Sequence, residues 1–247
     1  MVIPAEINGK PVRWIDNYAF EDCKLLTQII IPDSVEFIGN YAFSGCDGLT
    51  EIVIPDSVGR DRAGGVIPKF AFSGCDSLRS VTIGNNIEYI LPSAFRGCEN
   101  LTQVKLGNSI KEIFEEAFYG CEKLTTINFP DGLEYIRPYA FYGTKFVNLY
   151  FPDSVRVIQK RAFTGNQLKT VSFGKGIEFI NSGTFTSCSI ASITFRGNAP
   201  KSIYDDSFTS MYVRFEGNRA CEDYPRPKIF VNPDATGFNQ DSFPYRD

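Results

Sequence analysis

The chain has 247 residues, 43% of them hydrophobic and 22% charged, which is enough apolar material for a continuous core and excludes a disordered chain. Its formal net charge of −4 argues against binding to nucleic acid or to acidic membrane surfaces. Because the chain contains no histidine, Ser-His-Asp triads, Cys-His pairs and histidine metal ligands are excluded.

The N-terminal residues read like a piece of the segments farther along the chain, since Val2-Ile3-Pro4 resembles Ile30-Ile31-Pro32. No basic region and no hydrophobic leader precede them. No apolar run approaches the roughly 20 residues of a membrane-spanning helix, so we expect no such segment. The protein is then either cytoplasmic or secreted with a leader that is absent from this sequence, and the repeat-like start favours the second.

An isoleucine is followed five residues later by a phenylalanine nine times along the chain. Successive phenylalanines lie 22 or 23 residues apart, and once 29. A fixed period in the low twenties predicts one coil of a solenoid per repeat. The nine pairs are Ile15/Phe20, Ile38/Phe43, Ile67/Phe72, Ile90/Phe95, Ile113/Phe118, Ile136/Phe141, Ile158/Phe163, Ile180/Phe185 and Ile203/Phe208.

Each unit begins with a short segment of alternating apolar and polar residues, such as Leu49 to Ile54, which predicts a strand buried on one face. A proline or glycine, such as Pro55 or Gly84, then bends the chain away. On the returning arc, a glycine two residues after the phenylalanine, such as Gly45, permits positive φ and closes the coil. The predicted fold is a solenoid with a parallel sheet of short strands, one per 22–23-residue coil, and 3₁₀ or short extended segments on the arc.

This pattern predicts a single solenoid domain over residues 1–247. Six extra residues interrupt the second interval, and they are expected to loop out. The predicted parts are an N-terminal edge at 1–14, about nine repeats at 15–215, an insertion at 59–65 and a C-terminal cap at 216–247.

Six of the seven cysteines lie three residues after a phenylalanine, and only Cys221 lies elsewhere. A stacked column points its side chains the same way, which is poor geometry for disulfides, and close CxxC pairs are absent. We predict buried free thiols, with disulfides or a metal site as the alternatives. The column consists of Cys23, Cys46, Cys75, Cys98, Cys121 and Cys188.

No residue pattern predicts an enzyme. The adjacent carboxylates Glu115-Glu116 and Asp205-Asp206 are typical of a solvated surface rather than of acid–base catalysis. No glycine-rich phosphate-binding motif is present. We therefore predict no catalytic, cofactor-binding or metal-binding residues and no cofactor, and a hydrolase is the least favoured reading.

The unit from Ala42 to Val58, AFSGCDGLTEIVIPDSV, closely resembles the BspA-like class of leucine-rich repeats. The segment Ile7 to Val12 is similar to the lead-in of such arrays, and Ile229 to Pro233 to their closing strand. The resemblance implies an open leucine-rich-repeat solenoid. Proteins of this bacterial type are commonly secreted or displayed at the cell surface, and several act as adhesins. The class has no shared ligand motif, so the resemblance assigns no binding residue.

Side chains that alternate with the buried strand residues should form an exposed face of hydroxyls and amides, which suits a protein or glycan surface, although such residues are also ordinary filler on exposed strands. Its middle coils carry the most interaction-prone side chains, and Tyr150 is the expected anchor. The candidate partner-binding residues are Gln103, Lys105, Thr126, Asn128, Asn148 and Tyr150, with Arg60 and Arg62 of the insertion as a secondary candidate.

The leading hypothesis is a non-catalytic protein-protein interaction module, a secreted or cell-surface, adhesin-like protein. Its expected partner is a protein, with host and extracellular-matrix proteins among the candidates, and the chain is expected to be a monomer. The alternative is a carbohydrate-binding or cell-envelope structural module, which aromatics in line on the exposed face would favour. Tyr18, Tyr41 and Tyr139 lie on the opposite arc and are expected to be packing or rim positions.

Overall fold

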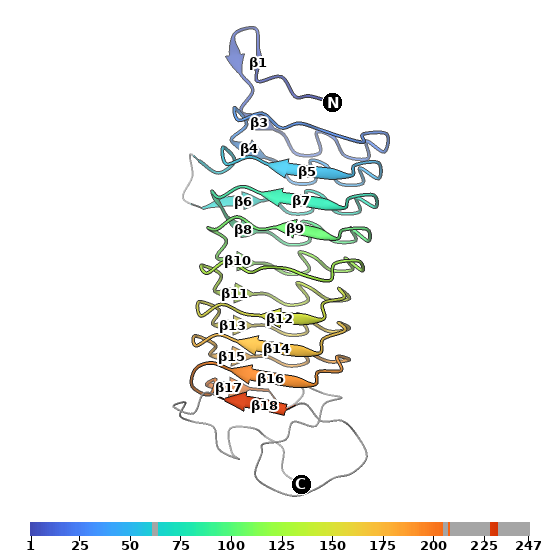
Figure 1. Cartoon of the computed structure of the whole chain (residues 1–247). Helices are drawn as coiled ribbons and strands as arrows, with labels where there is room; N and C mark the ends of the chain where they lie inside the picture. Colours follow the sequence, from blue (N-terminus) through green and yellow to red (C-terminus); the bar gives the residue numbers. More distant parts are fainter. Residues whose placement is uncertain (61–63, 205–206, 208–227, 232–247) are drawn as a thin grey trace, which may run out of the picture.

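The computed structural model describes residues 1–60, 64–204, 207 and 228–231. Successive turns of the chain stack on one another into an elongated β-solenoid (Figure 1). Two columns of parallel strands run along it, and a short antiparallel hairpin of β1 (Glu6–Ile7) and β2 (Lys10–Pro11) lies at the N-terminal end. Within the described residues, no helix has the length and apolarity needed to cross a membrane.

The first column of strands forms what we call the strand face. It is built from two parallel sheets, ordered β5-β7-β9 and β12-β14-β16-β18. Val2 adds a parallel bridge to Ile30 at the N-terminal end, in the register that their sequence similarity predicts. The strands are β5 (Glu51–Ile54), β7 (Ser80–Ile83), β9 (Gln103–Lys105), β12 (Asn148–Tyr150), β14 (Thr170–Phe173), β16 (Ser192–Phe195) and β18 (Lys228–Val231).

The second column follows the isoleucines. Ile90 aligns with Ile113 and Ile113 with Ile136, which confirms that equivalent side chains lie on top of one another. A seven-stranded parallel sheet is formed by β6, β8, β10, β11, β13, β15 and β17, and β3 pairs with β4. The strands are β3 (Trp14–Ile15), β4 (Phe37–Ile38), β6 (Gly65–Ile67), β8 (Ile87–Ile90), β10 (Glu112–Ile113), β11 (Tyr135–Ile136), β13 (Val157–Ile158), β15 (Phe179–Ile180) and β17 (Ser202–Ile203).

The phenylalanine column forms a continuous stack of rings at the centre of the solenoid. Phe95 and Phe118 are fully buried, with ring centroids 5.1 Å apart, and Phe118 and Phe141 are 5.2 Å apart. Coils one strand spacing apart, about 4.8 Å, bring like rings into near-parallel contact. The repeated phenylalanine therefore makes each coil dependent on its neighbours.

The sequence had predicted one strand per coil, but the coil at residues 124–129 contains no strand, so the strand face is interrupted there. The gap coincides with a change in the core, where an inward aliphatic position becomes aromatic between Leu106 and Phe129. From there a second ring stack runs from Phe129 through Phe151 to Phe173. Val104, in β9 beside the gap, and Ile127, in the strandless coil itself, are only partly buried.

The returning arc is a series of turns rather than a 3₁₀ helix, and no 3₁₀ helix occurs in the described ranges. Successive backbone amides on the arc donate hydrogen bonds alternately to the next coil and to their own coil. The amide of Phe43 donates to the carbonyl of Ala71 in the next coil, whereas the amide of Ser44 donates to the carbonyl of Tyr41 in its own coil. Bonds of the 3₁₀ type therefore cannot run consecutively. Gly45 has the positive φ that the sequence predicts, and Tyr41 has one as well.

The insertion leaves and rejoins the coil at two glycines. A Cβ added to Gly59 would lie 2.3 Å from the Cα of Gly65, so the two ends of the loop meet closely. Arg62 lies outside the described residues, as does most of the expected cap at 216–247. The exception is β18, which pairs with β16 where a closing strand was expected.

The cysteine column contains free thiols, and all but Cys23 are buried. Cys23 is exposed because it lies in the first coil, with no coil above it. The thiol of Cys98 donates a hydrogen bond to the carbonyl of Phe72, and Cys121 donates to Phe95. These thiols are packing groups, and burial raises their pKa values. Cys221 lies outside the described residues.

Candidate partner-binding face

All six predicted partner-binding residues are exposed, and they lie on three consecutive coils at the middle of the strand face. Gln103 and Lys105 belong to β9, and Asn148 and Tyr150 to β12 (Figure 1). The third pair, Thr126 and Asn128, lies on the strandless coil between them. The predicted residues therefore surround the gap between the two sheets.

Tyr150 is 58% exposed, and one face of its ring lies against a side chain that the sequence reading missed. The guanidinium of Arg196 stands 4.3 Å from the ring centroid. It also donates a hydrogen bond of 2.9 Å to the carbonyl of Phe151 and forms a 3.0 Å ion pair with Asp153. These contacts hold the aromatic ring beside a charged pair, and both tyrosine and arginine are enriched among binding hot spots.

Arg196 occupies a position where earlier coils have Pro152 and Gly174. An arginine in a proline or glycine column was therefore a visible departure from the repeat. Gly174 lies in the intervening coil and must be glycine for packing reasons, because a Cβ there would come within 2.2 Å of the Pro152 carbonyl oxygen. The short residue lets Arg196 reach the coil that carries Tyr150.

A hollow of about 510 Å³ lies at the ends of β5, β7 and β9. Its lining includes Lys105 and also Arg60, so the structure joins the first predicted site to the described part of the second. Asp33 and Asp56 line the same hollow. The Asp56 carboxylate accepts a 2.6 Å hydrogen bond from the backbone amide of Asn85, which fixes its position. Charges of both signs therefore meet at this edge of the strand face.

The second sheet carries an ordered row of charges that the sequence reading also missed. In this column, two positions before the isoleucine, the first three coils have Arg13, Glu36 and the uncharged Gly65, and in the six coils from Ile90 to Ile203 the residue is charged with a sign that alternates from coil to coil. We call this row the charge ladder; it consists of Glu88, Lys111, Glu134, Arg156, Glu178 and Lys201. Had like charges been stacked at every coil, they would have repelled one another.

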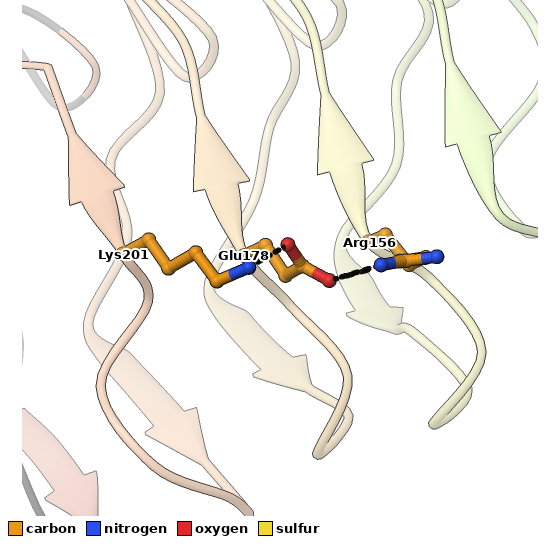
Figure 2. Close-up of polar contacts among 3 residues, drawn as sticks. All are labelled: Arg156, Glu178 and Lys201. Carbon is orange, nitrogen blue, oxygen red and sulfur yellow. Dashed lines mark hydrogen bonds and ion pairs between the residues drawn. The ribbon is translucent and has the colours of Figure 1, made fainter.

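Glu178 lies at the best-connected point of the charge ladder, between Arg156 and Lys201 (Figure 2). Its carboxylate accepts hydrogen bonds of 2.6 Å from Arg156 and 2.5 Å from Lys201. These donors hold the pKa of Glu178 below its ordinary value. At the other end, a 2.8 Å hydrogen bond to Glu88 raises the pKa of Lys111.

Aromatic side chains also form rows away from the strand face. On the arc, Tyr18 and Tyr41 stack at 5.1 Å, and Tyr41 stacks on Phe70 at 4.7 Å. Tyr18 is 55% exposed, so the end of this row reaches the surface. Tyr139 packs against Tyr142 in a tilted pair. In the described residues no group of His, Cys, Asp and Glu side chains is arranged to hold a metal ion.

Comparison with known proteins identifies the repeat. The profile of the BspA type Leucine rich repeat region matches six copies over residues 13–137 and 134–214, which is most of the chain. A comparison with curated proteins finds no match.

The chain is also similar to several solved structures, one of which has a TM-score above 0.5. Pneumococcal vaccine antigen PcpA is 19% identical over 92% of this chain and 68% of its own, with a TM-score of 0.52. A leucine-rich repeat protein from Eubacterium ventriosum is 32% identical over 52% of this chain, with a TM-score of 0.48. The aligned part is 33% of that protein's length. A leucine rich cell surface protein from Faecalibacterium prausnitzii is 22% identical over 84% of this chain and 78% of its own, with a TM-score of 0.35.

Proposed function

Since the chain belongs to the BspA-type leucine-rich repeat family, we propose that it is a non-catalytic module that binds a protein partner through the middle of its strand face. Leucine-rich repeat proteins are generally protein-interaction or surface modules. We further propose that this one acts outside the cell or at its surface, in an adhesin-like role. The family supports this location, as does the similarity in fold to a vaccine antigen.

The observation that carries the proposal is the exposure of all six candidate side chains on adjacent coils. An anchor for binding is present in the ring of Tyr150, held by Arg196, and Lys105 lies at the edge of a hollow with charges of both signs. These groups are fixed by the stacked coils beneath them. A partner therefore gains several contacts without ordering a loop, which lowers the entropic cost of binding.

The proposal is tested by comparing two triple variants for capture of extracellular-matrix proteins. One is K105A/N128A/Y150A on the strand face; the matched control is K160A/E122A/Y204A, which alters three exposed residues elsewhere. Loss of a captured protein in the first variant, with retention in the control, supports the site. Equal capture by both variants overturns it.

The alternative, a carbohydrate-binding or cell-envelope structural module, is favoured by the aromatic row of Tyr18, Tyr41 and Phe70. The rings of the row stack on one another, so the flat aromatic surface that would contact the apolar face of a ligand is that of Tyr18, the exposed ring at its end. A glycan array distinguishes this function. Glycan binding that is lost in Y18A and kept in the strand-face triple variant would favour the alternative.

A further inference from the structure

The charge ladder has a symmetry that the strand face lacks. Backbone hydrogen bonds hold its members in register: Lys111 donates to the carbonyl of Glu88, Glu134 to Lys111 and Arg156 to Glu134, at 2.8 to 2.9 Å. The next amide, that of Glu178, donates to Arg156. Read along the solenoid, the signs are minus, plus, minus, plus, minus, plus. Read in the opposite direction, every sign is reversed.

An alternating series with an even number of members is therefore complementary to its own reverse. A two-fold axis along the strand direction, placed between Glu134 and Arg156, reverses the solenoid while keeping each column opposite itself. It sets Glu88 opposite the partner's Lys201 and Lys111 opposite the partner's Glu178. Glu134 then faces the partner's Arg156. All six positions in each copy meet a charge of opposite sign.

We propose that two copies of this chain associate antiparallel through the outer face of the second sheet, with the charge ladder at the interface. The charged side chains of the ladder are not fully covered by contacts within their own chain, so they can contact a second copy. Lys111 and Arg156 are about half exposed, at 50% and 49% of their side chains. Glu134 forms no ion pair within the part of the chain that the structure describes, and it lies at the centre of the proposed interface.

Apolar side chains lie beside the charges at the same centre. Tyr135 and Val157 follow Glu134 and Arg156 directly, are partly buried, and pair with each other across β11 and β13. The two-fold axis sets Tyr135 of one copy opposite the partner's Val157. An apolar contact surrounded by charge pairs is the usual anatomy of a protein interface.

The size of the interface sets its expected strength. Six coils at about 4.8 Å each extend roughly 24 Å, which is small for a stable dimer, and exposed charges are screened by salt. Association is therefore weak and strongest at low ionic strength. The strand faces stay uncovered, so the dimer displays two partner-binding faces and gains avidity for a repetitive or surface-bound partner. A monomer is the expectation from the sequence, and the following experiment decides between the two.

The test is sedimentation of the full chain at low and high salt, together with the variants E134R and R156E. Each variant sets two like charges opposite each other at the centre of its own dimer, so self-association should weaken at least about tenfold. In an equimolar mixture the two variants are complementary, so dimers should return as heterodimers. A role for the ladder confined to contacts within one chain predicts no such rescue.

The outcomes are decisive in each direction. Salt-sensitive dimers of the unaltered chain, weakening in each variant and rescue by mixing support the proposal. A monomer at about 1 mM chain in low salt, where even weak association is detectable, overturns it, as does a mixture that does not associate. The matched control pair E122R and K160E alters exposed charges away from the ladder and should leave association unchanged.

If a single variant fails to fold, the double variant E134R/R156E, with both changes in one chain, provides the test instead. Its ladder still complements its own reverse, although alternation within the chain is lost, so it should dimerise like the unaltered chain. Failure of this folded double variant to associate also overturns the proposal. The strand-face variant K105A/N128A/Y150A should dimerise normally, which separates this inference from the proposed function.

Discussion

The guanidinium of Arg196 lies 4.3 Å from the centroid of the Tyr150 ring, although the two residues belong to coils two steps apart. The contact spans β14 and joins the candidate anchor to Asp153 through a 3.0 Å ion pair. A partly exposed cation–π contact contributes about 0.5–1 kcal/mol, and an exposed ion pair contributes up to about 1 kcal/mol.

We therefore expect R196A to lower the free energy of unfolding by about 1 kcal/mol. R196K keeps the positive charge but not the planar fork, and should lie between R196A and the unaltered chain. Urea denaturation measures both. Unchanged stability in R196A would show that Tyr150 is held by its strand alone.

Gly174 and Gly97 are predicted to tolerate alanine differently. A Cβ at Gly174 would lie 2.2 Å from the carbonyl oxygen of Pro152, so G174A forces the coils apart and should cost about 2–3 kcal/mol. At Gly97 the nearest atom would be 4.0 Å away, and the strain comes from its φ of +71°. G97A should cost about 1 kcal/mol. Equal losses in denaturant unfolding would contradict the close approach of backbones at Gly174.

The cysteine of the first coil should react with alkylating reagents, whereas the cysteines of the later coils should not. Cys23 is exposed, whereas burial raises the pKa of Cys46 to about 11 and that of Cys188 to about 12. Alkylation at pH 8 followed by peptide mass spectrometry should label Cys23 in the folded protein, with Cys75, Cys98 and Cys121 protected until unfolding. Prompt labelling of Cys98 would contradict the stacked core.

The charge ladder should stabilise the protein in a pH-dependent manner. Hydrogen bonds from Lys201 and Arg156 lower the pKa of Glu178 from its ordinary 4.5. A carboxyl with a depressed folded-state pKa stabilises the fold above pH 4.5, and this stabilisation disappears as the pH falls through the folded value. In E178Q the corresponding acid-side slope should be smaller. Identical slopes in thermal unfolding between pH 6 and about 3 would show that these contacts do not affect stability.

The repeat could be predicted almost completely from the sequence, because stacking forces each structural position to recur at a fixed spacing. The isoleucines of β8, β10 and β11 align as the 23-residue period requires. Tyr41 shows where this reasoning fails. Its positive φ repeats in other coils at Tyr18, Phe70 and Ser93, residue types that give no sign of a left-handed backbone.

The sequence pattern also does not predict the gap in the strand face. The segment from Leu124 to Phe129 has the same apolar alternation as its neighbours, yet no strand forms there. The break coincides with the change from aliphatic to aromatic layers in the core, and such a change involves neighbouring coils together rather than one repeat. The charge ladder and Arg196, in contrast, could have been found from the sequence. The ladder is an alternation of charges within one column, and Arg196 is an arginine in a column of prolines and glycines.

The most direct test of the binding face is site-specific photo-crosslinking. A photoreactive phenylalanine derivative replaces Tyr150 in one protein and Tyr204, which is 52% exposed, in the control. Incubation with extracellular-matrix proteins should give a crosslinked partner from position 150 that disappears when K105A/N128A is added. A crosslink of equal yield from position 204, or one that survives K105A/N128A unchanged, would contradict the assignment of the strand face as the binding surface.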